Sequence, residues 1–285
     1  MNKDLFKKYL IPLSPLPTPL NQSGKLDNKI KCILFDIYGT LFISGSGDIG
    51  TAKKVSQEPV SQEKGKIEHL LEKFKIKRNA KTLLKDFFDA IEINHANLKK
   101  KGIDFPEIEI NKIWALVLDF KNPDIARAFA LEFELIVNPV YPMPNLKEVL
   151  RELKNRHIML GIISNAQFFT PYLFDWFLKS DLKKLGFDPN LILFSYKFGH
   201  AKPSSFLFEV ASARLKDMNI PTDSILYVGN DILNDIYPAQ RAGFMTGLFA
   251  GDARSLRLRS DEPVCENLSA DIVITDLIQL LDHLY

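Results

Sequence analysis

The sequence has only two cysteines, no long uninterrupted hydrophobic run and almost no excess of charge of either sign. Cys32 and Cys265 lie far apart and fit no metal-ligand or redox spacing, so nothing indicates a disulfide framework or an oxidising compartment. The 37 basic residues nearly balance the 35 acidic residues, for a formal net charge of +2. We therefore expect no field of the whole molecule that would attract nucleic acid.

Signals for membrane insertion or export are also missing. No segment approaches the roughly 18 apolar residues that a membrane span requires. Near the N-terminus, Pro12, Pro15, Pro17 and Pro19 interrupt the apolar run, so the core of a signal peptide cannot form. We expect a cytoplasmic protein without a membrane partner.

The 285 residues, 46% of them hydrophobic, predict one large core and an accessory domain. Residues 1–28 are typical of a short amphipathic piece followed by a Pro-rich extended arm. Residues 44–136 predict a polar loop, up to about residue 66, and then four helices without strands. Residues 29–43 and 137–285 form the predicted core.

Short apolar strands alternate with helices in the core. The strands are expected at 31–36, 158–164, 191–195, 224–229, 245–250 and 271–275. This alternation predicts an α/β fold with a doubly wound, Rossmann-like parallel sheet. Ligands of such sheets bind outside the carboxyl ends of the strands. Polar residues fall at these ends: Asp36, Ser164, Asn165, Asn230 and Asp231.

Four stretches resemble the sequence motifs of the haloacid dehalogenase-like hydrolase superfamily. They are FDIYGTLF (35–42), ISNA (163–166), GHAKP (199–203) and VGNDILND (228–235), in that order along the chain. Each follows a predicted strand or opens a helix, which is the context that the motifs need. The resemblance implies a hydrolase with an aspartate nucleophile. A helical insertion between the first two motifs resembles the superfamily's type-one cap, which implies a small-molecule substrate.

The chemistry of the residues supports this resemblance. A carboxylate at the tip of a strand, here Asp36, can attack a phosphoryl or alkyl centre and form a covalent intermediate. Thr40 can hydrogen-bond that carboxylate or the transferred group, while Ser164 and the backbone amide of Asn165 can hold an oxygen on which charge develops. Lys202 supplies a positive charge opposite the nucleophile and the substrate.

The fourth motif suggests a metal. Asp231 and Asp235, together with Asp36, form a cluster of negative charge that predicts bound Mg²⁺. The backbone carbonyl of Tyr38 completes the expected ligand set. The alternative is that Asp231 and Asp235 only cap the following helix, as Asp does at N-terminal positions, although the two roles can coexist.

Two positions depart from the superfamily's phosphatases. Tyr38 stands where they usually carry a second Asp that protonates the leaving oxygen, and the superfamily's 2-haloacid dehalogenases have Tyr there. Asn230 stands either in place of a Gly or in place of the first acid of the fourth motif. The dehalogenases' halide-binding arginine has no counterpart soon after Leu41, since the nearest downstream arginine is Arg78.

Other polar residues receive simpler interpretations. We interpret His200 as an incidental loop residue, because no proton transfer is assigned to it. Arg254, Arg257 and Arg259 follow a strand together, and we interpret them as a solvated turn or an oligomer contact rather than an anion site.

Three functions therefore remain open. The first is a Mg²⁺-dependent phosphatase of a small phosphorylated metabolite, with residues 44–136 as a lid over the substrate. The second is a metal-independent 2-haloacid dehalogenase that uses Asp36 and Tyr38. The third is a non-catalytic binding or regulatory protein, suggested by Tyr38 and Asn230.

Overall fold

The computed structural model describes residues 3–46 and 61–284, and the chain divides into two compact units. The helical unit comprises Met1–Pro12 and Ser44–Val140, and the α/β unit comprises Leu13–Ile43 and Tyr141–Tyr285. The chain passes between the units along β3 (Phe42–Ser44) and β4 (Val140–Pro142), which pair with each other. The stretch predicted as one arm, residues 1–28, is thus shared by both units.

A seven-stranded sheet forms the centre of the α/β unit, in the order β1-β9-β8-β7-β2-β5-β6. The strands are β1 (Ser23–Gly24), β2 (Cys32–Phe35), β5 (Met159–Ser164), β6 (Phe187–Phe194), β7 (Ile225–Gly229), β8 (Met245–Phe249) and β9 (Ile272–Ile274). Strands β2 and β5 to β9 are parallel, and the two-residue β1 pairs antiparallel with β9. The predicted α/β parallel-sheet fold is confirmed.

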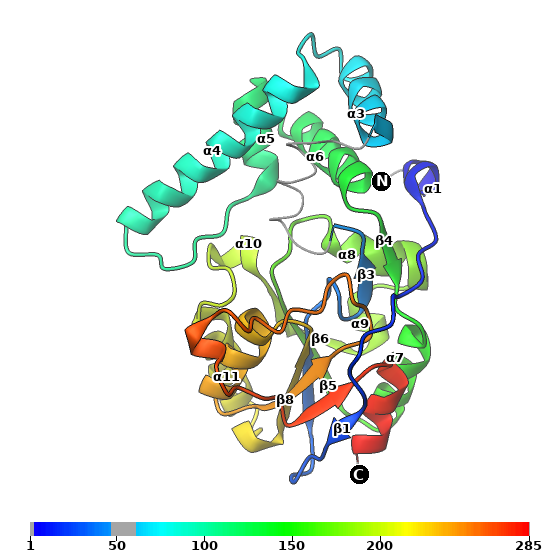
Figure 1. Ribbon diagram of the computed structural model, residues 1–285, viewed down its shortest axis with the longest axis vertical. Helices are drawn as coiled ribbons and strands as arrows, with labels where there is room; N and C mark the ends of the chain where they lie inside the picture. Colours follow the sequence, from blue (N-terminus) through cyan, green and yellow to red (C-terminus); the bar gives the residue numbers. More distant parts are fainter. Residues whose placement is uncertain (1–2, 47–60, 285) are drawn as a thin grey trace. The chain divides into compact units, whose positions relative to one another are not determined.

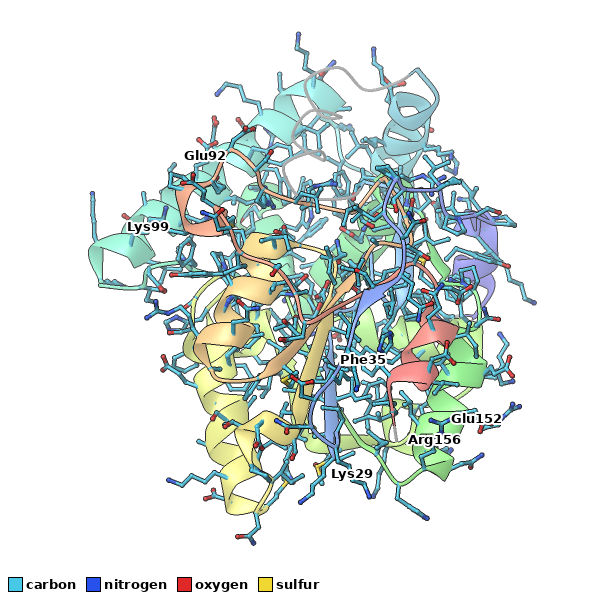
Figure 2. The ribbon with its side chains drawn as sticks, turned by 60° about the horizontal axis from the view of Figure 1, so that its bottom comes forward. Lys29, Phe35, Glu92, Lys99, Glu152 and Arg156 are labelled. Atoms are coloured by element: carbon cyan, nitrogen blue, oxygen red, sulfur yellow. The ribbon has the colours of Figure 1, made fainter. Side chains whose placement is uncertain are left out.

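Strand β2 lies in the middle of this sheet, with all four of its side chains buried. A strand that is covered by helices on both faces needs an uninterrupted apolar run, which explains the sequence CILF. Figure 2 shows Phe35, its last residue, inside the unit, whereas Glu152 and Arg156 lie at the periphery. Phe35 is aligned with Ile162 of β5 and with Val228 of β7. This register brings the ends of three strands together.

Helices cover both faces of the sheet. Figure 1 shows α11 (Phe206–Asp217) on one side and α7 (Leu146–Asn155) on the other. Helix α7 buries Leu146, Val149, Leu150 and Leu153, the spacing of one apolar face, and keeps its charged residues outward. The remaining helical segments of the unit are α8 (Thr170–Leu173), η1 (Phe174–Leu178), α9 (Leu182–Leu185), α10 (Ser195–Phe198), η2 (Thr222–Ser224), η3 (Ile232–Ile236), α12 (Tyr237–Arg241), η4 (Pro263–Cys265) and η5 (Leu277–His283).

The helical unit contains α1 (Lys3–Tyr9), α3 (Ser61–Lys73), α4 (Ala80–Lys100), α5 (Ile110–Leu118) and α6 (Pro123–Val137). Aromatic side chains form its core: Phe87 stacks on Trp114 with ring centroids 3.9 Å apart, and Phe129 and Phe133 pack edge-on against Trp114. The four predicted helices are present. Helix α3 begins at Ser61, although the loop was predicted to continue to about residue 66. Residues 47–60 of the predicted loop lie outside the described residues.

The Pro-rich stretch of the arm binds residues that follow β8 in the same unit. The backbone N–H of Leu16 donates to Asp252 Oδ1 at 3.0 Å, and the N–H of Ala253 donates to Leu16 O at 2.9 Å. Thr18 Oγ1 donates to Ala250 O at 2.7 Å. The arm thus holds the segment that follows β8. Within residues 3–46 and 61–284, no helix is long and apolar enough to cross a membrane.

Candidate active site

The candidate site lies where β2, β5 and β7 end. Asp36 directly follows β2 and donates its backbone N–H to Val228 O at 2.9 Å. Ser164 is the last residue of β5, and Asn230 directly follows β7. The first, second and fourth motifs therefore meet at one edge of the sheet, as the sequence predicted, because parallel strands align their carboxyl ends.

Asn165 brings the third motif to the same place. Its side-chain Oδ1 accepts a hydrogen bond from the backbone N–H of Lys202 at 2.7 Å, and its Nδ2 donates to Lys202 O at 3.2 Å. Both main-chain polar groups of Lys202 are thereby fixed. We expected the backbone amide of Asn165 to hold a substrate oxygen, and the structure adds a function for its side chain.

The ammonium group of Lys202 joins two carboxylates. Nζ donates to Asp36 Oδ1 at 2.7 Å and to Asp235 Oδ1 at 2.5 Å, and it lies 3.1 Å from the hydroxyl of Tyr227. Its side chain is only 3% exposed. Burial alone would lower the pKa of Lys202, but the attraction of Asp235 and Asp36 outweighs burial and raises that pKa. Lys202 therefore carries a positive charge at neutral pH.

Asp235 is saturated with hydrogen bonds. Its Oδ2 accepts the backbone N–H groups of Asn230 and Asp231 at 2.9 and 3.0 Å, and the Tyr227 hydroxyl lies 2.9 Å from Oδ1. Burial raises the pKa of Asp235 to about 6, against the opposing effect of Lys202. Asp235 thus connects the backbone of Asn230 and Asp231 to the ammonium group of Lys202.

Thr40 contacts the fourth motif and not the predicted nucleophile. Its Oγ1 donates to Asn230 Oδ1 at 3.0 Å, and Asn230 Nδ2 donates to Ser255 O at 2.6 Å. The side chain of Asn230 is thus held from both ends. Gly39, with φ of 86°, lies so close that an added Cβ would be 2.6 Å from Ser255 Cβ. We expected Thr40 to hydrogen-bond the Asp36 carboxylate or the transferred group, and in this structure its hydroxyl donates to Asn230.

Asp231 caps a helix and binds an arginine. Its Oδ1 accepts the backbone N–H groups of Leu233 and Asn234, at the start of η3, at 2.9 and 3.2 Å. Arg259 donates from Nε to both carboxylate oxygens and from a terminal nitrogen to Oδ2 at 2.5 Å. Asp231 thus makes the capping contacts that the sequence offered as one role, and Arg259 is a partner that the sequence did not indicate.

Two further predicted residues have distinct surroundings. The hydroxyl of Tyr38 lies 2.9 Å from Thr170 Oγ1, and either atom can be the donor. Ser164 is fully buried, and its Oγ has no hydrogen-bond partner among the residues that the structure describes. A buried hydroxyl without a partner is unusual and is suited to binding a ligand oxygen.

The superfamily's phosphatases imply a divalent metal, but the donor groups do not fit one. Across the described ranges, no group of three or more His, Cys, Asp or Glu is arranged to hold a metal ion. Lys202 lies between Asp36 and Asp235, while Arg259 binds both oxygens of Asp231. The predicted ligand set of Asp36, Tyr38, Asp231 and Asp235 is therefore not assembled, because two cations of the protein already bind its carboxylates.

Four contributing residues were missed by sequence reasoning. Tyr227 lies within the predicted strand 224–229 and was not singled out. Thr170 and Ser255 lie in segments without a motif, and Arg259 was interpreted as part of a solvated turn or an oligomer contact. Only the density of arginines at 254–259 could have drawn attention to Arg259.

The sequence is similar to those of known hydrolases. A family model described as haloacid dehalogenase-like hydrolase matches residues 30–243. A glyceraldehyde 3-phosphate phosphatase of Methanocaldococcus jannaschii is 27% identical over 164 residues, which are 56% of this chain and 67% of that protein. A ribulose-1,5-bisphosphate 5-phosphatase of Halopiger xanaduensis is 29% identical over 142 residues, 49% of this chain and 55% of that protein.

Solved structures show the same fold. A crystal structure of a dehalogenase is similar to this chain with a TM-score of 0.52 and 15% sequence identity. The match covers 90% of this chain and 97% of the dehalogenase chain. At this identity the similarity concerns the fold and not the reaction.

Proposed function

Because the chain belongs to the haloacid dehalogenase-like hydrolase family, we propose that this hydrolase removes phosphate from a small phosphorylated metabolite through Asp36. The observation that carries the proposal is the buried ion pair of Asp36 with Lys202, at the ends of the central strands. Both curated relatives reported above are phosphatases of phosphorylated sugars. They support a substrate of the same class.

Asp36 acts as the nucleophile. One carboxylate oxygen attacks the phosphorus, the bond between phosphorus and the leaving oxygen breaks, and its electron pair stays with the leaving oxygen. Water then attacks the phosphorus of the aspartyl phosphate, and phosphate leaves as the Asp36 carboxylate is restored. Lys202 lowers the repulsion between the anionic nucleophile and the anionic substrate throughout.

Three residues prepare the site. The buried Oγ of Ser164 donates a hydrogen bond to a phosphoryl oxygen, which supplies the partner that it lacks among the described residues. Asn165 holds the backbone of Lys202 in place. Thr40 orients Asn230 at the start of the fourth motif. The predicted lid function of residues 44–136 stays a prediction.

The leaving oxygen takes its proton from Tyr38 or from water. A free phenol has a pKa near 10, so it donates a proton to an alkoxide but accepts one poorly at neutral pH. This favours an acid role in the first step and leaves the second step without a strong general base.

A second function is the hydrolysis of a short 2-haloacid. Tyr38 favours it, because the superfamily's 2-haloacid dehalogenases have Tyr at this position. The donor groups of the site also favour it, because they do not fit a metal and this reaction needs none. In that reaction Asp36 attacks the carbon that bears the halogen, halide leaves, and water attacks the carbonyl carbon of the resulting ester. The absence of an arginine between Leu41 and Arg78 argues against it.

One experiment separates the two functions. Phosphate release from p-nitrophenyl phosphate and from glycerol phosphate, and halide release from 2-chloropropionate, are measured with a chelator and with added Mg²⁺. Asp36→Asn is the test variant, and Asp119→Asn, which makes the same change at a side chain that is 81% exposed, is the control. We expect phosphate release that is lost in Asp36→Asn and kept in Asp119→Asn. Phosphate release that persists in Asp36→Asn contradicts the proposal.

Isotope labelling shows which atom water attacks. During turnover in H₂¹⁸O, an aspartyl phosphate sends the label into released phosphate, whereas an ester intermediate sends it into the Asp36 carboxylate. Mass spectrometry of the phosphate and of the peptide that contains Asp36 therefore distinguishes phosphatase chemistry from dehalogenase chemistry.

A further inference from the structure

We propose that Arg259 is a positioning residue of this site, which gives Asp231 a permanent positive partner where related sites use a divalent metal. The inference deepens the proposed function and, in its kinetic part, rests on it. It assigns a purpose to a residue that no sequence motif includes.

The contact between Arg259 and Asp231 has the geometry of a guanidinium fork. Nε lies 3.0 Å from Oδ1 and 3.2 Å from Oδ2, and a terminal nitrogen lies 2.5 Å from Oδ2. The side chain of Asp231 is 9% exposed and that of Arg259 is 26% exposed. A buried carboxylate without a partner is costly, and a two-pronged arginine is the partner that best matches it. This pair therefore differs from an ordinary surface ion pair, which contributes little.

Arg259 is linked to Asp36 by direct contacts. The backbone N–H of Asp231 donates to Asp235 Oδ2, and Lys202 donates both to Asp235 Oδ1 and to Asp36 Oδ1. Each contact is 3.2 Å or shorter. A displacement of Asp231 thus shifts the carboxylate that holds Lys202, and Lys202 in turn holds the nucleophile.

The segment that carries Arg259 is docked on the fourth motif. The backbone N–H of Arg257 donates to Asn230 O at 2.9 Å, and the N–H of Ile232 donates to Arg257 O at 2.9 Å. Ser255 O accepts from the Asn230 side chain. Arg259 itself has a φ of 53°, in the left-handed region that a residue with a side chain rarely adopts. Such a conformation persists where surrounding contacts hold it, and here it aims the guanidinium at Asp231.

The charges of the site explain the purpose of this arrangement. Three carboxylates, Asp36, Asp231 and Asp235, lie in one network with two cations, Lys202 and Arg259. A divalent ion on Asp231 would have to displace Arg259 from both oxygens. Arg259 therefore stabilises the fourth motif without a bound ion, and it lowers the affinity of the site for divalent metals.

A metal titration without substrate tests this inference. Binding of Mn²⁺ is measured by calorimetry for the wild type, Arg259→Gln and Arg257→Gln. The control variant loses the same charge from the same segment, but among the described residues the guanidinium of Arg257 donates to the backbone carbonyls of Arg254 and Leu256 and not to Asp231. We expect Arg259→Gln to bind Mn²⁺ about tenfold more tightly than the other two proteins, because Asp231 loses its cation. Equal affinity in all three overturns the inference.

Kinetics give the second readout. With p-nitrophenyl phosphate, we expect Arg259→Gln to lower kcat about 10- to 100-fold at an unchanged KM, since the nucleophile is misplaced while substrate contacts remain. Arg259→Lys should recover part of kcat because it keeps the charge but lacks the fork. An equal fall of kcat in Arg257→Gln overturns the positioning role.

The two proposals fail in different ways. If the wild type hydrolyses no phosphate ester, the proposed function fails, and the Mn²⁺ titration still decides on Arg259. If Arg259→Gln does not fold, Arg259→Met, which also removes the charge, replaces it in the titration, with Arg257→Met as its control. Tighter Mn²⁺ binding by Arg259→Met than by Arg257→Met then supports the inference, and equal binding overturns it.

Discussion

Thr40 Oγ1 donates a hydrogen bond to Asn230 Oδ1 at 3.0 Å, although 190 residues separate the two in the chain. The amide nitrogen of Asn230 donates at its other end to Ser255 O. This pair of contacts determines which way the amide points, because only the nitrogen can donate to a carbonyl. The first motif, the fourth motif and the segment after β8 are thus joined through one neutral side chain.

Replacement of Asn230 by Asp tests that arrangement. The new carboxylate would turn an acceptor toward Ser255 O, so a donor-acceptor contact becomes a repulsive one. We expect Asn230→Asp to lose about 1–3 kcal/mol of unfolding free energy, the cost of an unsatisfied buried polar group. Urea denaturation at pH 8 measures it, with Asn97→Asp on the exposed surface of α4 as the control. Equal stabilities of the two variants would show that Ser255 does not fix the amide.

Gly39 lies against the same two residues. An added Cβ would be 2.7 Å from Asn230 Nδ2 and 2.6 Å from Ser255 Cβ, and φ is 86°. We expect Gly39→Ala to destabilise the protein by more than the roughly 1–2 kcal/mol that a left-handed backbone costs alanine, and to lower kcat. Gly199→Ala is the matched control, because φ is 73° there and nothing lies within 4 Å of the added Cβ. Thermal unfolding and turnover of both variants test this, and similar losses in both would rule out a specific clash at Gly39.

Tyr38 determines which leaving groups are tolerated. A nitrophenolate leaves without a proton, whereas the alkoxide of glycerol phosphate needs one. We expect Tyr38→Asp, which supplies a carboxyl group at the leaving oxygen, to raise turnover of glycerol phosphate at least about tenfold and that of p-nitrophenyl phosphate much less. The ratio of the two rates is the measurement, and Tyr38→Asn, which cannot donate a carboxyl proton, is the control. An unchanged ratio in Tyr38→Asp would exclude a proton transfer at this position.

The activity should depend on the ionisation of Asp235. Burial raises the pKa of Asp235 to about 6, so the carboxylate that holds Lys202 is lost as the pH falls through that value. We expect kcat/KM to fall on the acid side with an apparent pKa near 6, a value that belongs to the coupled group of Asp235, Lys202 and Asp36. A pH profile between about 4 and 8 measures it. An acid limb near pH 4, the ordinary range of a carboxyl group, would contradict the coupling.

The sequence was sufficient to predict which polar residues meet at the ends of the central strands. Asp36, Ser164 and Asn230 end apolar strands, and the alternation of strands with helices implies that these ends meet at one edge of a parallel sheet. Lys202 lies in a loop between two helices, and only the order of the motifs indicated that it belongs there. The α/β fold followed from the same alternation.

The partners of these residues could not be predicted, because no local pattern encodes them. Arg259 reaches Asp231 across 28 positions, and nothing in the run GDARSLRLRS distinguishes it from Arg254 or Arg257. The magnesium prediction rested on the negative charge of Asp36, Asp231 and Asp235, and the structure pairs Asp231 with Arg259. The arm was predicted to be extended, but its hydrogen-bond partners were not predicted. These partners lie more than 230 positions further along the chain.

The docked arm has a consequence for the order in which the protein forms. Leu16 and Thr18 bind residues 236 and 232 positions further along, and Ser23 pairs with Val273. During synthesis these early residues leave the ribosome long before their partners exist. Closing so long a loop is slow, since the chain entropy is lost before any contact compensates for it. We expect the edge strand β1 and the segment that carries Arg259 to become ordered last, so that activity appears after most of the sheet has already formed.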